Sequence, residues 1–94
     1  MKENKKTMDD IFETKDKWQV PFLLTQNSIK LEGTKILSGI VYFQFSPKED
    51  CQKLVNDFIV RKAPLVQPKD LLDAVEIFRD RIFEMKDKNK NAKF

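Results

Sequence analysis

Residues 40–50 read IVYFQFSPKED, and this stretch joins a strand signal directly to the start of a helix. Its first half is rich in β-branched and aromatic residues, which favour strands. Side chains alternate between the two faces of a strand, so Val41, Phe43 and Phe45 share one face. We expect that face to be core, whereas the opposite face, which carries Tyr42, is semi-polar and available for contacts.

The second half of the stretch predicts the first turn of a helix. Ser46 as N-cap, Pro47 at the first helical position and Glu49 at the third match a capping box. The helix is expected to end before Pro64, which disfavours helical geometry in the residue that precedes it. Five apolar side chains recur at the spacing of one buried helix face, namely Cys51, Leu54, Val55, Phe58 and Ile59.

The segments before residue 40 predict a partner strand and, ahead of it, a helix. Residues 29–32 alternate apolar and polar side chains, and Ser38-Gly39 separates them from the later strand, which indicates a β-hairpin. Farther upstream, Thr14 is a candidate N-cap, and apolar residues follow it at helical spacing. We therefore predict a short or kinked helix from Thr14, ended by Asn27.

The N-terminal residues 1–13 are expected to form a partly disordered segment, because Met1 to Lys6 are polar and rich in lysine. Thr7 precedes two acidic residues in the manner of an N-cap. This pattern predicts one short helical turn through Ile11 and Phe12 that packs on the core.

A long C-terminal helix is predicted from Pro68 to about Lys86 or Lys88. Five of its apolar residues are spaced 4, 3, 4 and 3 apart, as in a heptad seam, and they are Leu71, Val75, Phe78, Ile82 and Met85. Four more apolar residues widen this seam, namely Leu72, Ala74, Ile77 and Phe83. The helix thus carries more apolar surface than one buried side needs.

The 94 residues are enough for one domain. We predict a small α+β domain over residues 14–86, with the order helix, β-hairpin, helix and long C-terminal helix, followed by a basic flexible tail at 87–94. The core face of the hairpin is expected to pack on both later helices. A hairpin alone leaves two strand edges open to pairing.

The residue types present exclude much of the usual catalytic chemistry. The chain has no histidine, so His-based nucleophile activation and zinc sites are absent. Cys51 lies on the predicted buried stripe, where a small apolar role is expected rather than a nucleophile. The acidic residues of 9–13 and 70–80 are explained by helix first turns and surface pairs rather than by Mg²⁺ binding. We therefore predict that the chain is not an enzyme and takes no cofactor.

We expect a cytoplasmic protein, because the chain has a single cysteine and no signal segment. We expect no membrane contact, because no apolar run is long enough to span a bilayer. The leading hypothesis is binding of a protein partner or a second copy, through the sheet edge and the apolar side chains of the C-terminal helix and the loop before it. The predicted interface comprises Leu71, Val75, Phe78, Ile82, Met85, Leu65 and Val66. If both sides of this helix are instead core, no such interface exists.

The alternative hypothesis is a nucleic-acid accessory protein, because a basic groove with an aromatic side chain suits a single strand. The formal net charge is only +3, with both signs mixed along the chain. The candidate contacts lie on the hairpin, the loop after residue 60 and the tail, and they are Lys30, Lys35, Tyr42, Arg61, Lys62, Lys86, Lys88, Lys90 and Lys93.

Six short segments also carry a likeness to known proteins. They are Thr14-Lys15-Asp16, Phe22-Leu23-Leu24, Lys30-Leu31-Glu32-Gly33, Val41-Tyr42-Phe43-Gln44-Phe45, Leu54-Val55-Asn56-Asp57-Phe58 and Arg81-Ile82-Phe83. Over residues 14–83 the chain resembles a family of short bacterial and phage proteins known only as a domain of unknown function. The resemblance implies the order of elements and carries no catalytic residue, and a phage origin would imply an inhibitor or accessory role.

The chain departs from that family at two places. The family pattern has a glycine and then basic residues in the hairpin turn, where this chain reads Ser38-Gly39-Ile40. It also has an aspartate before the proline that opens the last helix, where this chain has Gln67-Pro68. The missing basic turn weakens the case for a hairpin contact to nucleic acid, and glutamine is a poorer cap than aspartate.

Overall fold

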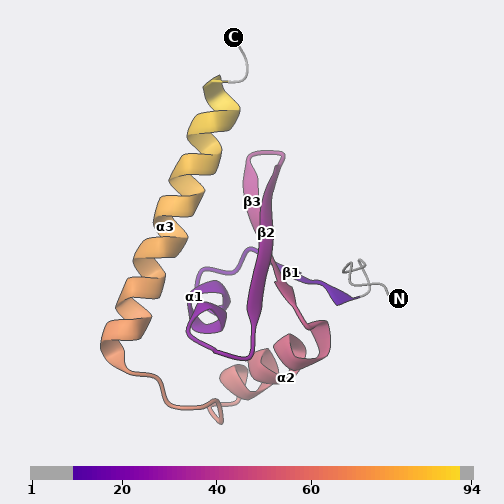
Figure 1. Cartoon of the computed structure of the whole chain (residues 1–94), viewed down its shortest axis with the longest axis vertical. Helices are drawn as coiled ribbons and strands as arrows, with labels where there is room; N and C mark the ends of the chain where they lie inside the picture. Colours follow the sequence, from indigo (N-terminus) through magenta and orange to yellow (C-terminus); the bar gives the residue numbers. More distant parts are fainter. Residues whose placement is uncertain (1–9, 92–94) are drawn as a thin grey trace.

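The computed structural model describes residues 10–91, with side chains as far as Lys88. The chain is a small α+β domain with an antiparallel sheet and a long C-terminal helix, as predicted (Figure 1). Its elements in order are β1 (Phe12–Thr14), α1 (Gln19–Leu24), β2 (Lys30–Leu37), β3 (Ile40–Ser46), α2 (Lys48–Ile59) and α3 (Pro68–Asn91).

The sheet has three strands in the order β1-β3-β2, so the predicted hairpin of β2 and β3 is confirmed and a third strand is added to it. β1 pairs antiparallel with β3, with Phe12 opposite Phe45 and Thr14 opposite Phe43. The predicted helical turn through Phe12 is therefore wrong at that residue, because pairing with β3 holds it extended. Thr7, its predicted N-cap, lies outside the described residues.

The hairpin turn is set by two residues with left-handed backbone conformation. Ser38 has φ 53° and Gly39 has φ 79°, and they form the two-residue connection between β2 and β3. Positive φ at both central residues is the requirement of a type I′ turn, whose twist matches that of paired strands. Between Leu31 and Gly33 the register shifts, which marks a β-bulge in the edge strand β2.

Helix α1 starts later and ends earlier than predicted. Thr14 belongs to β1, and the first turn of α1 is capped instead by Asp16, whose Oδ1 accepts hydrogen bonds from the Trp18 and Gln19 amides at 2.8 and 2.9 Å. Pro21 lies in that first turn, where its missing N–H interrupts no helical hydrogen bond. The helix ends at Leu24, so its expected stop at Asn27 is also wrong.

Helix α2 begins at Lys48, without the predicted capping box. Ser46 is the last residue of β3, and its buried hydroxyl donates a hydrogen bond to Glu32, so it does not cap the helix. Asp10 instead accepts a hydrogen bond from the Lys48 amide at 3.4 Å. Of the predicted apolar stripe, Cys51 and Val55 are buried and Leu54 and Phe58 are half-buried.

The last member of that stripe, Ile59, is exposed, contrary to the prediction. It is the final residue of α2, where the chain leaves the helix for the loop. The predicted end of the helix before Pro64 is confirmed.

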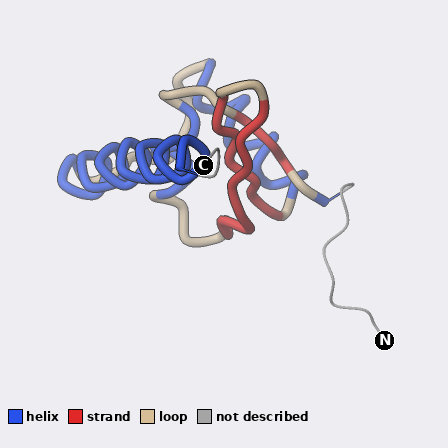
Figure 2. Tube along the Cα trace, turned by 90° about the horizontal axis from the view of Figure 1, so that it is seen from above, coloured by secondary structure: helices blue, strands red, loops and turns tan. Residues whose placement is uncertain are grey.

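The core lies between one face of the sheet and the helices. Phe43 is fully buried, and Val41 and Phe45 are buried beside it, which confirms the predicted core face of β3. The Phe78 ring of α3 lies 5.3 Å from the Phe43 ring, and α2 contributes Cys51 to the same cluster. Both later helices therefore pack on this face, and α1 packs against both of them, between α3 and the strands in the view of Figure 1. Figure 2 shows the long helix α3 to one side of the strands.

Helix α3 begins at Pro68 as predicted and continues beyond the predicted end at Lys86 or Lys88 to Asn91. Residues 87–91 are thus helical, although they were expected to begin a flexible tail. The first half of α3 packs on α1. The second half of α3 contacts β2 through two hydrogen bonds of 3.4 Å each. Arg81 donates one to the Thr34 hydroxyl, and that hydroxyl donates the other to the Met85 sulfur. No helix within residues 10–91 is long and apolar enough to cross a membrane.

Candidate protein-binding surface

The buried thiol of Cys51 is not placed for nucleophilic chemistry. Its side chain is fully buried on α2. Burial, aided by the negative charges of Asp50 and Asp10, raises the pKa of this thiol to about 11. It is therefore protonated at neutral pH, and the thiolate is the reactive form. No group of three or more acidic or cysteine side chains in the described part of the chain is arranged to hold a metal ion.

The most distinctive surface feature is an apolar hollow of about 360 Å³ where α1, the end of α2, the following loop and the start of α3 meet. All ten residues that line it are apolar. They include Trp18, Phe22, Phe58, Leu65, Leu71 and Val75. The Phe22 and Phe58 rings stack at 5.0 Å and form its floor, because both are at least half-buried.

The loop after α2 is shaped so that it presents Leu65 at the edge of this hollow. Arg61 takes a left-handed conformation with φ 64°, and the Lys62 amide donates to the Asp57 carbonyl at 2.7 Å, which ends the helix as in a Schellman-type cap. Pro64 follows in this loop, and its ring fixes the backbone φ angle at that position. Leu65 is left fully exposed, although it is a large apolar side chain.

The rim of the hollow carries two more exposed apolar side chains, Trp18 and Leu71. Trp18 directly precedes α1, outside its buried face, and the Lys17 ammonium lies 5.1 Å from the centre of its ring. On α3, Leu72 is 65% exposed and Phe83 is 76% exposed. We call these five side chains the apolar flank: Trp18, Leu65, Leu71, Leu72 and Phe83.

The residues of the predicted interface fall into two groups. Leu71, Val75, Leu65 and Val66 line the hollow. Phe78, by contrast, is buried on Phe43, and the half-buried Ile82 and Met85 pack against the core. The heptad seam is therefore mostly the inner side of α3, and its one exposed member, Leu71, lies at its N-terminal end.

Sequence reasoning did not place Trp18 at this surface, and it treated Leu72 and Phe83 only as a widening of the seam. Trp18 was missed because it was placed inside a helix from Thr14, whereas α1 starts just after it. For Leu72 and Phe83 a usable signal exists: both lie about a quarter of a turn or more from the centre of the seam.

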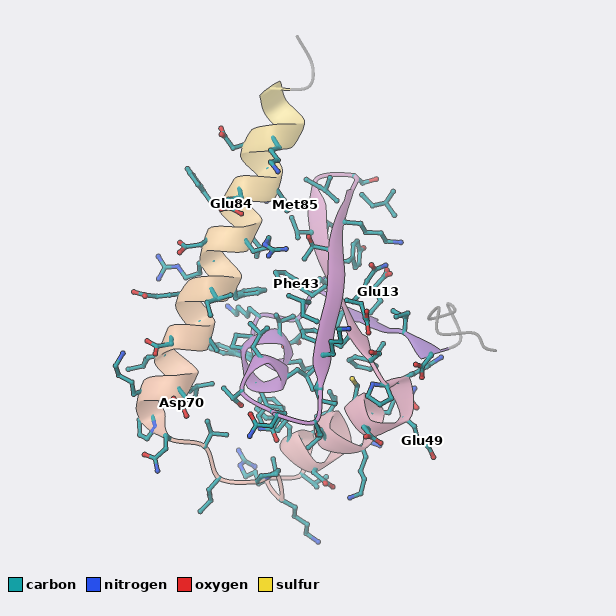
Figure 3. All side chains as sticks on the ribbon, viewed as in Figure 1. Glu13, Phe43, Glu49, Asp70, Glu84 and Met85 are labelled. Carbon is teal, nitrogen blue, oxygen red and sulfur yellow. The ribbon has the colours of Figure 1, made fainter. Side chains whose placement is uncertain are left out.

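The residues proposed to contact nucleic acid are not gathered into one groove. Lys35 lies opposite Tyr42 on the outer face of the sheet, where its ammonium pairs with Glu13 at 3.3 Å. Lys30 lies at the other end of β2, opposite Ser46. Figure 3 shows Phe43 on the α3 side of the sheet and Glu13 on the other side.

The remaining basic candidates lie on other parts of the molecule. Arg61 and Lys62 are in the loop between α2 and α3, whereas Lys86 and Lys88 are in the last two turns of α3. The Lys90 side chain and Lys93 lie outside the described residues.

Comparison of the chain with protein-family models, with curated proteins and with solved structures finds no match. The resemblance to the bacterial and phage family of unknown function therefore stays a prediction.

Proposed function

We propose that this chain is a non-enzymatic interaction module that binds a protein through the apolar flank. The observation that carries the proposal is the hollow, because large apolar side chains surround it, none of its lining is charged and its rim is exposed. Aromatic side chains are enriched, and charged ones depleted, at the centre of protein interfaces.

The area of the apolar flank supports this interpretation. From the exposed fractions of its five side chains, covering them would remove on the order of 600 Å² of mostly apolar surface from water. A standard protein interface buries about 800 Å² on each partner, so the flank with its polar border has a suitable size.

The sheet edge, the other part of the predicted interface, is less suited to binding. The edge strand β2 has a bulge and two lysines, features that discourage the addition of another strand. The opposite edge strand, β1, has only three residues. The helical surface is therefore the stronger candidate.

Nucleic-acid binding is the competing function, and solution mass separates the two. Light scattering at low and high salt, with and without a mixed-sequence single-stranded oligonucleotide, is expected to show no association with the oligonucleotide. A shift in mass at low salt that disappears at high salt would indicate phosphate contacts instead.

A position-specific crosslink tests the protein-binding surface directly. A photo-reactive amino acid in place of Leu65 is expected to crosslink to a protein in cells, because this fully exposed residue stands at the rim of the hollow. The same group in place of Gln52, an exposed residue of α2 outside the lining, is the matched control. Equal or absent crosslinking at both positions would refute the proposed surface.

A further inference from the structure

One stripe of α3 has an order of side chains that is complementary to the same stripe run in the opposite direction. Leu72, Glu76, Arg79 and Phe83 are spaced 4, 3 and 4 residues apart, so they lie on one side of the helix over about three turns. All four are exposed. The stripe has an apolar side chain at each end and an acid and a base between them.

This order matches a second helix of the same sequence in only one orientation. If two α3 helices lie antiparallel, with a two-fold axis midway between Glu76 and Arg79, then Leu72 faces Phe83 of the second copy and Glu76 faces Arg79 of the second copy. Each contact occurs twice, as two-fold symmetry requires. A parallel pair would place Glu76 against Glu76 and Arg79 against Arg79, which is repulsive.

The two charged residues of the stripe are available for such contacts. Within the described residues, the ion pairs of α3 join Lys69 to Asp73 and Arg81 to Glu84, and none involves Glu76 or Arg79. Shallow hollows flank the Phe83 ring, one beside Ile82 and Lys86 and another beside Glu76 and Arg79. A side chain of a facing helix fits such a depression as a knob fits a hole.

We propose that the α3 part of the apolar flank, Leu72 and Phe83, binds a second copy of the chain in an antiparallel α3–α3 pair along Leu72, Glu76, Arg79 and Phe83. This inference rests on the proposed function and specifies its partner. Leu72 and Phe83 together present on the order of 250 Å² of apolar surface per copy. With the bordering polar side chains, the contact lies at the small end of specific interfaces, so the dimer depends on protein concentration.

Charge reversal tests the pairing. Arg79→Glu places two Glu–Glu contacts in the homodimer, and Glu76→Arg places two Arg–Arg contacts there. Each variant alone is expected to dimerise roughly 100-fold more weakly than the wild type in sedimentation equilibrium, about tenfold for each reversed pair. An equimolar mixture of the two is expected to form a heterodimer within about tenfold of the wild-type affinity, because every contact is then attractive.

Lys88→Glu is the matched control, because it makes the same change of charge on the opposite side of the same helix. It is expected to leave dimerisation within about twofold of the wild type. Far-UV circular dichroism checks that all variants are folded.

A cysteine pair gives a second readout that does not depend on charge. A mixture of Leu72→Cys and Phe83→Cys chains is expected to form a disulfide-linked dimer under mild oxidation, while each variant alone forms little. The native Cys51 is buried and stays out of this reaction.

A wild type that stays monomeric at every concentration would overturn the α3–α3 pair, as would charge-reversed variants that dimerise normally or a mixture that stays monomeric. These failures differ from failure of the proposed function. If the pair is absent but the photo-reactive group at position 65 still crosslinks a different protein, the surface stands and only the partner was wrong. If that crosslink is absent too, both proposals fail.

Discussion

Replacing Phe78 by alanine is expected to lower the free energy of unfolding by about 3 kcal/mol, whereas the same change at Phe83 is expected to cost less than about 0.5 kcal/mol. The two residues lie on the same helix and differ in exposure. Phe78 is 7% exposed, with its ring 5.3 Å from that of Phe43, and Phe83 is 76% exposed.

The magnitude follows from what each ring contacts. Truncating a buried phenylalanine costs about 3–5 kcal/mol, and a contact between two aromatic rings contributes about 0.5–1.5 kcal/mol of this. The lower end applies to Phe78, because α3 has solvent on its other side and can shift toward the cavity. A domain of this length has about 5–14 kcal/mol of stability, so the Phe78 variant would still fold, with a Tm lower by roughly 12–24 °C.

Urea denaturation followed by far-UV circular dichroism measures both variants. The protein should be dilute enough that α3–α3 pairing is negligible, because pairing would add stability that Phe83→Ala removes. An equal decrease in the free energy of unfolding at the two positions, or a larger decrease for Phe83→Ala, would mean that α3 presents a different side to the sheet. That result would refute the packing of Phe78 on Phe43.

Three further predictions concern the rest of the core and the hairpin. The pKa of the Cys51 thiol is raised from 9.0 to about 11 in the folded chain. The stability that the protonated thiol contributes is therefore complete below pH 9 and is lost as the pH rises toward 11. Urea titrations at several pH values should show this decline in the free energy of unfolding, and the Cys51→Ser variant should lack it. Ser46→Ala removes the donor to half-buried Glu32 and is expected to cost about 1–2 kcal/mol, so an unchanged urea midpoint would contradict a role for this hydrogen bond. Ser38→Asn supplies the preferred residue of a type I′ turn and is expected to add roughly 0.5 kcal/mol to the free energy of unfolding. Gly39→Ala is expected to lower it by about 1 kcal/mol, because residue 39 has a positive φ. Thermal denaturation that gave the opposite sign for the two variants would contradict this.

The hairpin and α3 were predictable because their signals are local. The strand at 40–45 alternates with period two beside the turn at Ser38-Gly39, and α3 follows a first-turn proline with a long seam of helical period. β1 gives no such signal. It has only three residues, and its stability comes from pairing with a strand 31 residues later in the chain, as the hydrogen bond between Gln44 and Glu13 illustrates.

The errors at helix starts have a related cause, which is that a polar side chain can serve more than one purpose. Thr14 is compatible with both a helix cap and a strand, but it pairs with Phe43 in the sheet. Asp16 therefore caps α1. Ser46 likewise suits a cap, but its hydroxyl bonds to Glu32 across the hairpin, and Asp10 caps α2 from β1's side of the sheet. Sequence spacing shows the candidates for a cap, and only tertiary contacts decide between them.

The placement of β1 also bears on whether the molecule aggregates. Residues 40–45 are a run of six with high β-propensity and no charge, proline or glycine, which is the composition of segments that stack into amyloid fibrils. In the folded chain β2 and β1 pair with the two sides of this run, so the backbone of residues 43–45 is shielded from other molecules. A chain shortened to begin at Thr14, where the domain boundary was predicted, would lose most of the pairing between β1 and β3. We expect such a chain to form fibrils.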